Sequence, residues 1–348
     1  MGCCSSKILF TKETERKNND TEEHSSKKKE LITKEIKTRN EINLIYYAEF
    51  DDTYQIFGKK FAVNNKDNID LIFGEKQIKL VDKYSFRKGD NKVTMIIKNK
   101  LTNLSFMFSE CKILKDITEL KYLDVSESIS FEYMFYGCNR IKDIKPLENW
   151  DVSNSNNFAC MFSSCESLSD IKPLENWNVS NANNFQNMFS YCDSLINITP
   201  LKHWNVSNVN DFSCMFSSCK SLSDVKALEN WNVSNANNFG SMFYGCSSLK
   251  DIKALGNWNV SNVNNFQYMF FKCIVLSDIK ALENWNVSNG NKFISMFAYC
   301  ESLSDIKPLE NWNVSNGKYF GYMFYGCKLL KDLKPLEKWN VLNENKVK

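Results

Sequence analysis

The amino-acid sequence predicts an α/β fold: a solenoid of nine 27-residue coils, each with one short strand and one short helix. Nine cysteines, from Cys111 to Cys327, stand 27 residues apart. All eight tryptophans and a set of Met-Phe pairs keep the same interval, without an insertion or a deletion. Because a unit of this size cannot bury its apolar positions alone, neighbouring units must stack.

Residues 1–40 are expected to form an acylated, flexible tether. The opening Met-Gly-Cys-Cys-Ser-Ser-Lys fits the N-myristoylation pattern M-G-x-x-x-[ST] at Gly2, and Cys3 and Cys4 stand where S-palmitoylation follows. Two acyl signals hold a protein stably to a bilayer, whereas one gives marginal binding. The alternative is an unmodified tail with reactive thiols. Residues 11–40 are rich in Lys, Glu, Asn and Thr, a composition typical of flexible segments.

The N-terminal segment also predicts a location. Acyl chains would bind the chain to the cytoplasmic face of a membrane, and we expect the plasma membrane. The apolar run at residues 8–10 is shorter than the apolar region of a signal peptide, and no segment approaches the length of a transmembrane helix. The cell surface is the alternative location, where the repeated Asn-x-Ser sequons, such as the one at Asn178, would carry glycans.

Residues 41–104 are expected to form a small β-rich capping domain. Apolar runs over residues 43–47, 69–73 and 93–97 are typical of strands, and Gly74 and Gly89 mark tight turns between such runs. This domain would cover the first coil, in which a leucine takes the tryptophan position.

Residues 105–348 carry the coils, and residues 158–184 illustrate one of them. Four apolar residues fall at i, i+3, i+4 and i+7, the stripe of a short amphipathic helix: Phe158, Met161, Phe162 and Cys165. Residues 168–172 suit a short strand, which must end there because the next position is proline in five coils and alanine in three. We expect buried thiols, since zinc sites need Cys or His pairs two to four residues apart.

The unit N-F-x-x-M-F-x-x-C-x-S-L-x-D-I-K-P-L-x-N-W-N-V-S-N resembles the BspA-like leucine-rich repeats, in the mycoplasma-lipoprotein-type variant. The match covers residues 105 to about 341, roughly two-thirds of the chain. The resemblance implies a leucine-rich-repeat-like solenoid, a fold frequent in surface and adhesion proteins whose ligands are protein surfaces.

Two sets of outward positions are candidates for partner binding. The first stacks aspartates beside lysines on the expected strand face: Asp170, Lys172, Asp224, Lys226, Asp251, Lys253, Asp278, Lys280, Asp305 and Lys307. The alternative is mutual charge neutralisation on a solvated face. The second set is aromatic, because exposed tyrosine is favoured at binding hot spots: Tyr268, Phe271, Tyr299 and Tyr322. Gap-filling between coils explains the aromatic set equally well.

The composition argues against two classes of function. The formal net charge is +3 at pH 7, which gives no electrostatic case for nucleic acid as a partner. Two histidines are a poor supply for general acid–base catalysis, and we expect no enzyme activity, no cofactor and no metal. The sequence therefore predicts a membrane-tethered scaffold for a protein partner, with an extracellular adhesion protein as the alternative. End-to-end self-association through the C-terminal coil is a further expectation.

Overall fold

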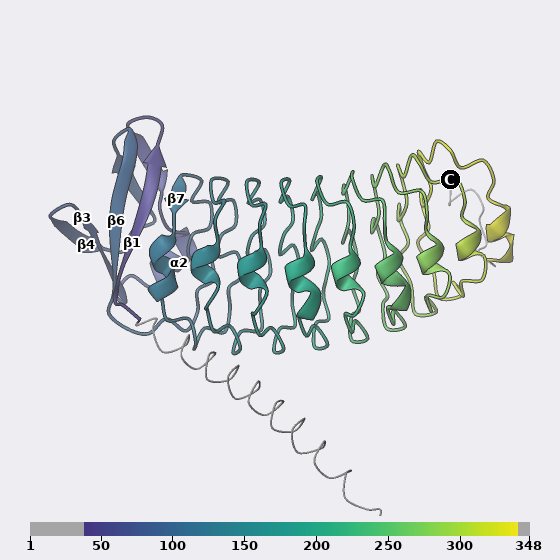
Figure 1. Ribbon diagram of the computed structural model, residues 1–348, viewed down its shortest axis with the longest axis horizontal. Helices are drawn as coiled ribbons and strands as arrows, with labels where there is room; N and C mark the ends of the chain where they lie inside the picture. Colours follow the sequence, from purple (N-terminus) through teal and green to yellow (C-terminus); the bar gives the residue numbers. More distant parts are fainter. Residues whose placement is uncertain (1–37, 340–348) are drawn as a thin grey trace, which may run out of the picture. The chain divides into compact units, whose positions relative to one another are not determined.

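The structure, a computed structural model, describes residues 38–339. From residue 40 onward, a small β-sheet region is followed by a row of 27-residue repeats that lie side by side (Figure 1). The expected acylation sites Gly2, Cys3 and Cys4 lie outside the described residues. Within residues 38–339, no helix combines the length and the apolar character needed to cross a membrane.

An antiparallel sheet forms the first part of this region. Its strand order is β4-β3-β6-β1-β7, and β2 and β5 pair separately. The bounds are β1 Glu41–Ala48, β2 Asp52–Gln55, β3 Ile69–Phe73, β4 Lys76–Lys79, β5 Lys83–Phe86, β6 Gly89–Ile97 and β7 Leu114–Asp116. The three apolar runs expected to be strands lie in β1, β3 and β6. Gly74 and Gly89 have φ of 61° and 110°, which glycine adopts without steric cost.

The sheet continues into the first repeat. β7 lies in that repeat and pairs antiparallel with β1. The short helix α2 (Lys59–Asn64), which the sequence did not predict, also meets the first repeat, because the N–H of Gly58 donates to the carbonyl oxygen of Met107 at 3.0 Å. A Cβ at position 58 would lie 1.9 Å from the carbonyl oxygen of Phe106, so glycine is required for this close approach.

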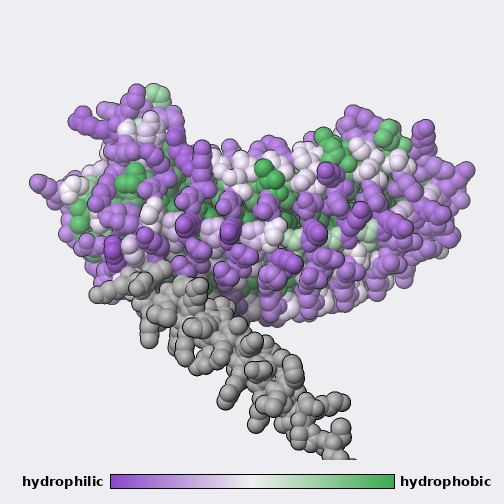
Figure 2. Space-filling model, in the orientation of Figure 1, coloured by the Kyte–Doolittle hydropathy of each residue, from purple (hydrophilic) through white to green (hydrophobic). Residues whose placement is uncertain are grey.

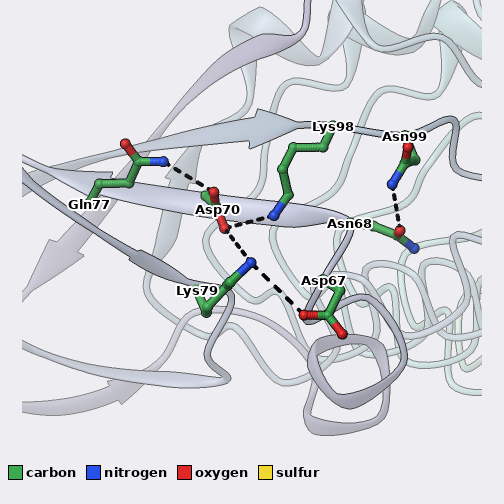
Figure 3. Close-up of polar contacts among 7 residues, drawn as sticks. All are labelled: Asp67, Asn68, Asp70, Gln77, Lys79, Lys98 and Asn99. Atoms are coloured by element: carbon green, nitrogen blue, oxygen red, sulfur yellow. Dashed lines mark hydrogen bonds and ion pairs between the residues drawn. The ribbon is translucent and has the colours of Figure 1, made fainter.

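A charged cluster links the outer strands of the sheet (Figure 3). The carboxylate of Asp70 in β3 accepts hydrogen bonds from Lys98 Nζ at 3.0 Å and from Gln77 Nε2 at 3.1 Å. The Nζ of Lys79 in β4 lies 3.6 Å from Asp70 and 3.9 Å from Asp67. The hydrogen bond from Lys98 lowers the pKa of Asp70 below its ordinary value. Because these groups pair with one another, we assign the cluster a structural role.

Each repeat contains one 3-10 helix, and these helices recur at the 27-residue period of the sequence (Figure 1). We number the repeats 1–9 by their periodic cysteines, from Cys111 to Cys327. The helices are η1 Thr118–Tyr122, η2 Lys145–Leu147, η3 Lys172–Leu174, η4 Thr199–His203, η5 Lys226–Leu228, η6 Lys253–Asn257, η7 Lys280–Leu282, η8 Lys307–Leu309 and η9 Lys334–Lys338.

The amphipathic helix expected over residues 158–165 does not form, so this prediction was wrong. The segment consists of tight turns, in which the N–H groups of Met161 and Cys165 each bond to the carbonyl oxygen three residues earlier. Cys160 and Ser164 have φ of 56° and 59°, in the left-handed region, which interrupts a right-handed helix. The apolar stripe fits these turns as well as a helix, because the same four apolar side chains are buried in both.

The turns satisfy their remaining backbone groups by joining neighbouring repeats. The N–H groups of Cys160, Phe162 and Ser164 donate to carbonyl oxygens 26 residues further along, in the next repeat, at 2.7 to 2.9 Å. The two left-handed positions recur in repeats 1–9, and glycine fills one of them in three repeats: Gly137, Gly245 and Gly326. Alternate amides therefore bond within a repeat and between repeats.

The strand expected over residues 168–172 was also wrong for most repeats. β7 occupies this position in repeat 1, and in the other described repeats the pairing here is limited to one parallel bridge, between Asp224 and Asp251. The chain instead enters a 3-10 helix, because Asp170 Oδ1 accepts the N–H of Lys172 at 2.8 Å. Proline is compatible with the start of such a helix, where its missing N–H needs no partner.

The core consists of columns of identical residues. Phenylalanine rings stack from repeat to repeat, with centroids 5.8 and 5.9 Å apart at two successive steps. The indole N–H of Trp177 donates to the carbonyl oxygen of Leu147 in the preceding repeat at 3.0 Å. The thiol of Cys165 donates to the carbonyl oxygen of Phe135 at 3.2 Å. Both Trp177 and Cys165 are buried, which confirms the expected interior tryptophans and thiols.

Candidate interaction surfaces

Variation between the repeats is concentrated in the turns. Four positions change from copy to copy, while the Phe, Met, Phe and Cys around them are kept in repeats 2–9. In repeat 3 the four positions are Ala159, Cys160, Ser163 and Ser164. We call these positions and their equivalents the turn face. Because the buried framework is constant, the turn face can carry different side chains on the same backbone.

An aromatic cluster occupies the turn face of repeats 6–9. Its members are Tyr244, Tyr268, Phe271, Tyr299, Tyr322 and Tyr325. Tyr244 and Phe271 stack with centroids 4.7 Å apart and planes 7° apart. The other contacts are edge-to-face, with centroids 5.3 to 5.9 Å apart and interplanar angles of 73° to 84°. Such pairs stabilise a structure by about 0.5 to 1.5 kcal/mol beyond their burial, so the rings hold one another in place.

The aromatic cluster is partly open to solvent and carries positive charge. Tyr322 and Tyr325 are 62% and 51% exposed, and the other members are half-buried. The Nζ of Lys272 lies 5.5 Å from the ring centroid of Phe271 and 5.7 Å from that of Tyr299, a cation–π arrangement. No turn-face position of repeats 6–9 holds an acidic residue. Ordered, exposed aromatic surfaces of this kind are typical of protein-binding sites.

All four aromatic residues that the sequence indicated as binding candidates belong to this cluster: Tyr268, Phe271, Tyr299 and Tyr322. Several of their ring contacts cross from one repeat to the next, as gap-filling requires. Their partial exposure leaves room for a partner as well, and binding by these residues stays a prediction.

A second aromatic group lies on the turn face of repeats 1 and 2. Phe106 and Tyr133 stack with centroids 5.0 Å apart, and Tyr136 meets Tyr133 at 5.3 Å and 65°. The Cys160 thiol beside the Tyr133 hydroxyl raises the pKa of Tyr133 to about 12, so the phenol stays neutral at physiological pH. Phe106 was not among the predicted site residues, although its place at the second turn-face position would have identified it.

The aspartate and lysine columns have a local structural role. In repeats 2, 3 and 5–9, the aspartate Oδ1 accepts the N–H of the lysine two residues on, at 2.7 to 3.1 Å. Repeat 4 keeps this bond between Asn197 and Thr199 at 2.8 Å, which explains why asparagine can replace aspartate there. Among the described column residues, Asp332 and Lys334 alone form an ion pair, at 3.8 Å. Direct ion pairs therefore do not neutralise the columns in the other repeats.

The two columns are not a uniform surface. Hydrophilic side chains cover much of the face shown in Figure 2, and in the middle of the row two adjoining hollows of about 600 and 460 Å³ open between repeats 5, 6 and 7. Six of the predicted column residues line these hollows: Asp224, Lys226, Asp251, Lys253, Asp278 and Lys280. The other four lie outside both: Asp170, Lys172, Asp305 and Lys307.

The last described repeat presents backbone amides that have no described acceptor. The N–H groups of Phe320, Tyr322, Phe324 and Gly326 correspond to those that bond to a following repeat elsewhere, and residues 38–339 offer them no acceptor. An edge with free amides can pair with another chain. The expected end-to-end self-association remains a prediction.

The described residues give little material for catalysis. Across residues 38–339, no three His, Cys, Asp or Glu side chains gather as metal ligands. Burial raises the pKa of Cys165 and that of Cys246 to about 12. These two thiols stay protonated at neutral pH and are unsuited to act as nucleophiles.

Comparison with known families gives one match. A family model described as "Mycoplasma protein of unknown function, DUF285" matches residues 83–197, 170–273 and 249–348, so the matches together span the repeats. The comparisons with curated proteins and with solved structures found no match.

Proposed function

The chain belongs to the family of Mycoplasma proteins of unknown function, DUF285, and we propose that it is a membrane-tethered scaffold that binds a protein partner and has no chemistry of its own. One observation carries the proposal: the aromatic cluster holds six rings against one another over four repeats and leaves them partly exposed. Aromatic side chains in such positions supply much of the binding energy at protein interfaces.

The proposed architecture is a leucine-rich-repeat-type solenoid of the BspA-like kind. Three features support it: the 27-residue period, the backbone bonds from each repeat to the next, and the buried columns of identical side chains. In such a fold each repeat contacts its neighbours alone. The turn face can then vary from repeat to repeat without loss of the core.

The chemistry of the cluster suggests the kind of partner surface that fits it. Lys272 stands among the rings, and the turn face of repeats 6–9 lacks acidic residues. A partner with an apolar or aromatic side chain next to a carboxylate would match both features, because complementary charge around an apolar centre favours specific association.

A comparison of captured proteins tests this surface. The full chain, the variant Tyr299→Ser/Tyr322→Ser/Tyr325→Ser and the control Tyr191→Ser are expressed in the same cells, and bound proteins are quantified by mass spectrometry. Tyr191 is a suitable control because it lies on the turn face of repeat 4, outside the cluster, and is 51% exposed. We expect a partner that the triple variant loses at least about tenfold and the control retains. An identical set of bound proteins for all three chains would contradict the proposal.

We also propose that Gly2 carries a myristoyl group and that Cys3 or Cys4 carries a palmitoyl group, at the cytoplasmic face of a membrane. Intact mass and membrane partitioning in a eukaryotic cell test this, with Gly2→Ala and Cys3→Ser/Cys4→Ser as comparisons. Acyl mass on the wild type and a soluble Gly2→Ala chain would support the tether. An unmodified wild type would exclude it, and glycans at exposed sequons such as Asn178 would favour the adhesion-protein alternative.

A further inference from the structure

Repeat 6 departs from its neighbours at three places close together in the chain. Lys250 stands where repeats 3, 5, 7 and 8 carry serine, and Gly256 stands where repeats 2, 3, 5 and 7–9 carry glutamate. Ala254 stands where five repeats carry proline. Among repeats 2–9, repeat 6 alone combines all three departures. Relative to repeat 5, the first two changes add one positive charge and remove one negative charge.

The two hollows meet at this repeat. Lys250, Asp251 and Lys253 line both of them. Alanine replaces the proline ring in repeats 5, 6 and 7, and the hollows are lined by Ala254 and by Ala281. We call the two hollows together the repeat 6 groove. It lies where three successive repeats lack the bulk of a proline.

Backbone bonds fix one wall of the repeat 6 groove. The residues Asp224 and Asp251 form a parallel bridge, and the N–H of Lys250 donates to the carbonyl oxygen of Ser223 at 3.0 Å. In the described part of repeats 2–9, no other bridge joins this stretch of two neighbouring repeats. The groove is therefore organised before any ligand binds, which limits the entropy lost on binding.

The charges in the groove are unequally engaged. The three aspartates each use one carboxylate oxygen to accept a backbone N–H, at 2.8 to 3.1 Å. The ammonium groups of four lysines form no ion pair with a described residue. They are Lys226, Lys250, Lys253 and Lys280. Free ammonium groups on both sides of a hollow favour a ligand that carries carboxylates.

We infer that the repeat 6 groove binds an acidic segment of a partner protein. Its carboxylates lie against the four lysines, and its backbone occupies the space left over Ala254 and Ala281. The groove is built from a different stretch of each repeat than the turn face. The inference is therefore independent of the aromatic cluster and adds a second binding site.

Binding of a fluorescein-labelled glutamate-rich peptide to the full chain, measured by fluorescence anisotropy, tests this inference. We expect Lys250→Ser/Ala254→Pro/Gly256→Glu to weaken binding at least about tenfold. Each change installs the residue that repeat 3 already carries, so the fold is expected to tolerate it; a Cβ at Gly256 would meet its nearest atom at 3.4 Å, an ordinary contact. The matched control is Lys172→Ser, in repeat 3, which should leave affinity unchanged.

A transfer experiment keeps the inference falsifiable if the restored repeat loses stability. The changes Ser169→Lys, Pro173→Ala and Glu175→Gly place the three departures of repeat 6 in repeat 3, and this chain should bind the peptide more tightly than the wild type. Affinity should also fall with added salt, because exposed charges are screened. Equal binding of a glutamine-rich peptide, or equal affinity of the restored and wild-type chains, would overturn the inference. Loss of binding to phosphatidylserine vesicles in the restored chain, without peptide binding in the wild type, would assign the groove to lipid instead.

Discussion

The indole Nε1–H of Trp204 donates a hydrogen bond to the carbonyl oxygen of Leu174 at 2.9 Å, across the boundary between repeats 4 and 3. Equivalent bonds recur at each tryptophan from Trp150 to Trp339. Because both groups are buried away from water, each bond satisfies a carbonyl that has little access to another donor. The tryptophan column thus joins the repeats as well as filling the core.

Replacing Trp204 with phenylalanine should expose the value of this bond. The ring stays apolar, but the carbonyl oxygen of Leu174 loses its buried donor, and we expect a loss of about 2 kcal/mol in the free energy of unfolding. The urea midpoint, followed by circular dichroism, measures it. Lys202→Ala, at an exposed position three residues away or fewer in the same 3-10 helix, should change stability by less than about 0.5 kcal/mol. Equal midpoints for the two variants would refute the assigned role.

The buried thiols should make the protein sensitive to alkali. Burial raises the pKa of Cys246 from 9.0 to about 12. An unfolded thiol ionises near pH 9 while the folded one stays protonated, so its contribution to stability is complete below pH 9 and is lost as the pH rises toward 12. Each such thiol lowers stability by about 1.4 kcal/mol per pH unit in that range.

The comparison of Cys246→Ala with the wild type isolates this effect. At neutral pH the variant should be less stable by about 1 kcal/mol, because it lacks the sulfur and its hydrogen bond to the Phe216 carbonyl oxygen. Above pH 9 the gap should close, since alanine has no proton to lose. Urea midpoints taken at increasing pH measure the gap, and a constant difference would contradict the pKa assignment.

The left-handed turn positions predict a stabilising substitution. Ser164 has φ of 59°, a conformation that costs a non-glycine residue about 1 kcal/mol or more, and repeats 2, 6 and 9 carry glycine at this position. Ser164→Gly should therefore raise the free energy of unfolding by about 0.5 to 1 kcal/mol. Ser163→Gly, one residue earlier and outside the left-handed region, should lower it. The thermal or urea midpoint decides, and a destabilised Ser164→Gly chain would show that the turn is described wrongly.

The aspartate column predicts a pair of substitutions with different outcomes. Asp170→Ala removes the acceptor for the N–H of Lys172 and should cost about 1 kcal/mol, the usual value of a helix N-cap. Asp170→Asn should be close to neutral, because Asn197 makes the same bond in repeat 4. Equal losses in the two variants would indicate that the charge of the aspartate matters and its hydrogen bond does not.

Much of the fold could be predicted because the repeat makes each position visible many times. The buried columns followed from the common period of cysteine and tryptophan, and the first strands followed from apolar runs such as residues 69–73. The local structure of the repeat could not be predicted from the apolar stripe. Residues at i, i+3, i+4 and i+7 face one side in a helix and also in two consecutive turns. The signal that distinguishes them is glycine at positions 137, 245 and 326, which has no reason to recur in a short helix.

The candidate sites were predicted in part. The sequence placed Tyr268 and Tyr299 on a variable surface, but their edge-to-face contacts through Phe271 require the spacing of the stacked repeats. The hollow beside Ala254 depends on whether the proline ring of other repeats stands at the surface, which a sequence alone does not give. The helix α2 escaped prediction because its six residues are too few to show a periodic pattern.

One measurement tests the central claim most directly: photo-crosslinking in cells from two equivalent turn-face positions. A crosslinking phenylalanine analogue replaces either Tyr299, in the aromatic cluster, or Ser164, at the same position of repeat 3. The account predicts a discrete protein adduct from position 299 and none from position 164. Adducts of the same mass and yield from both positions, or none from position 299 where the intact chain is folded and abundant, would contradict it.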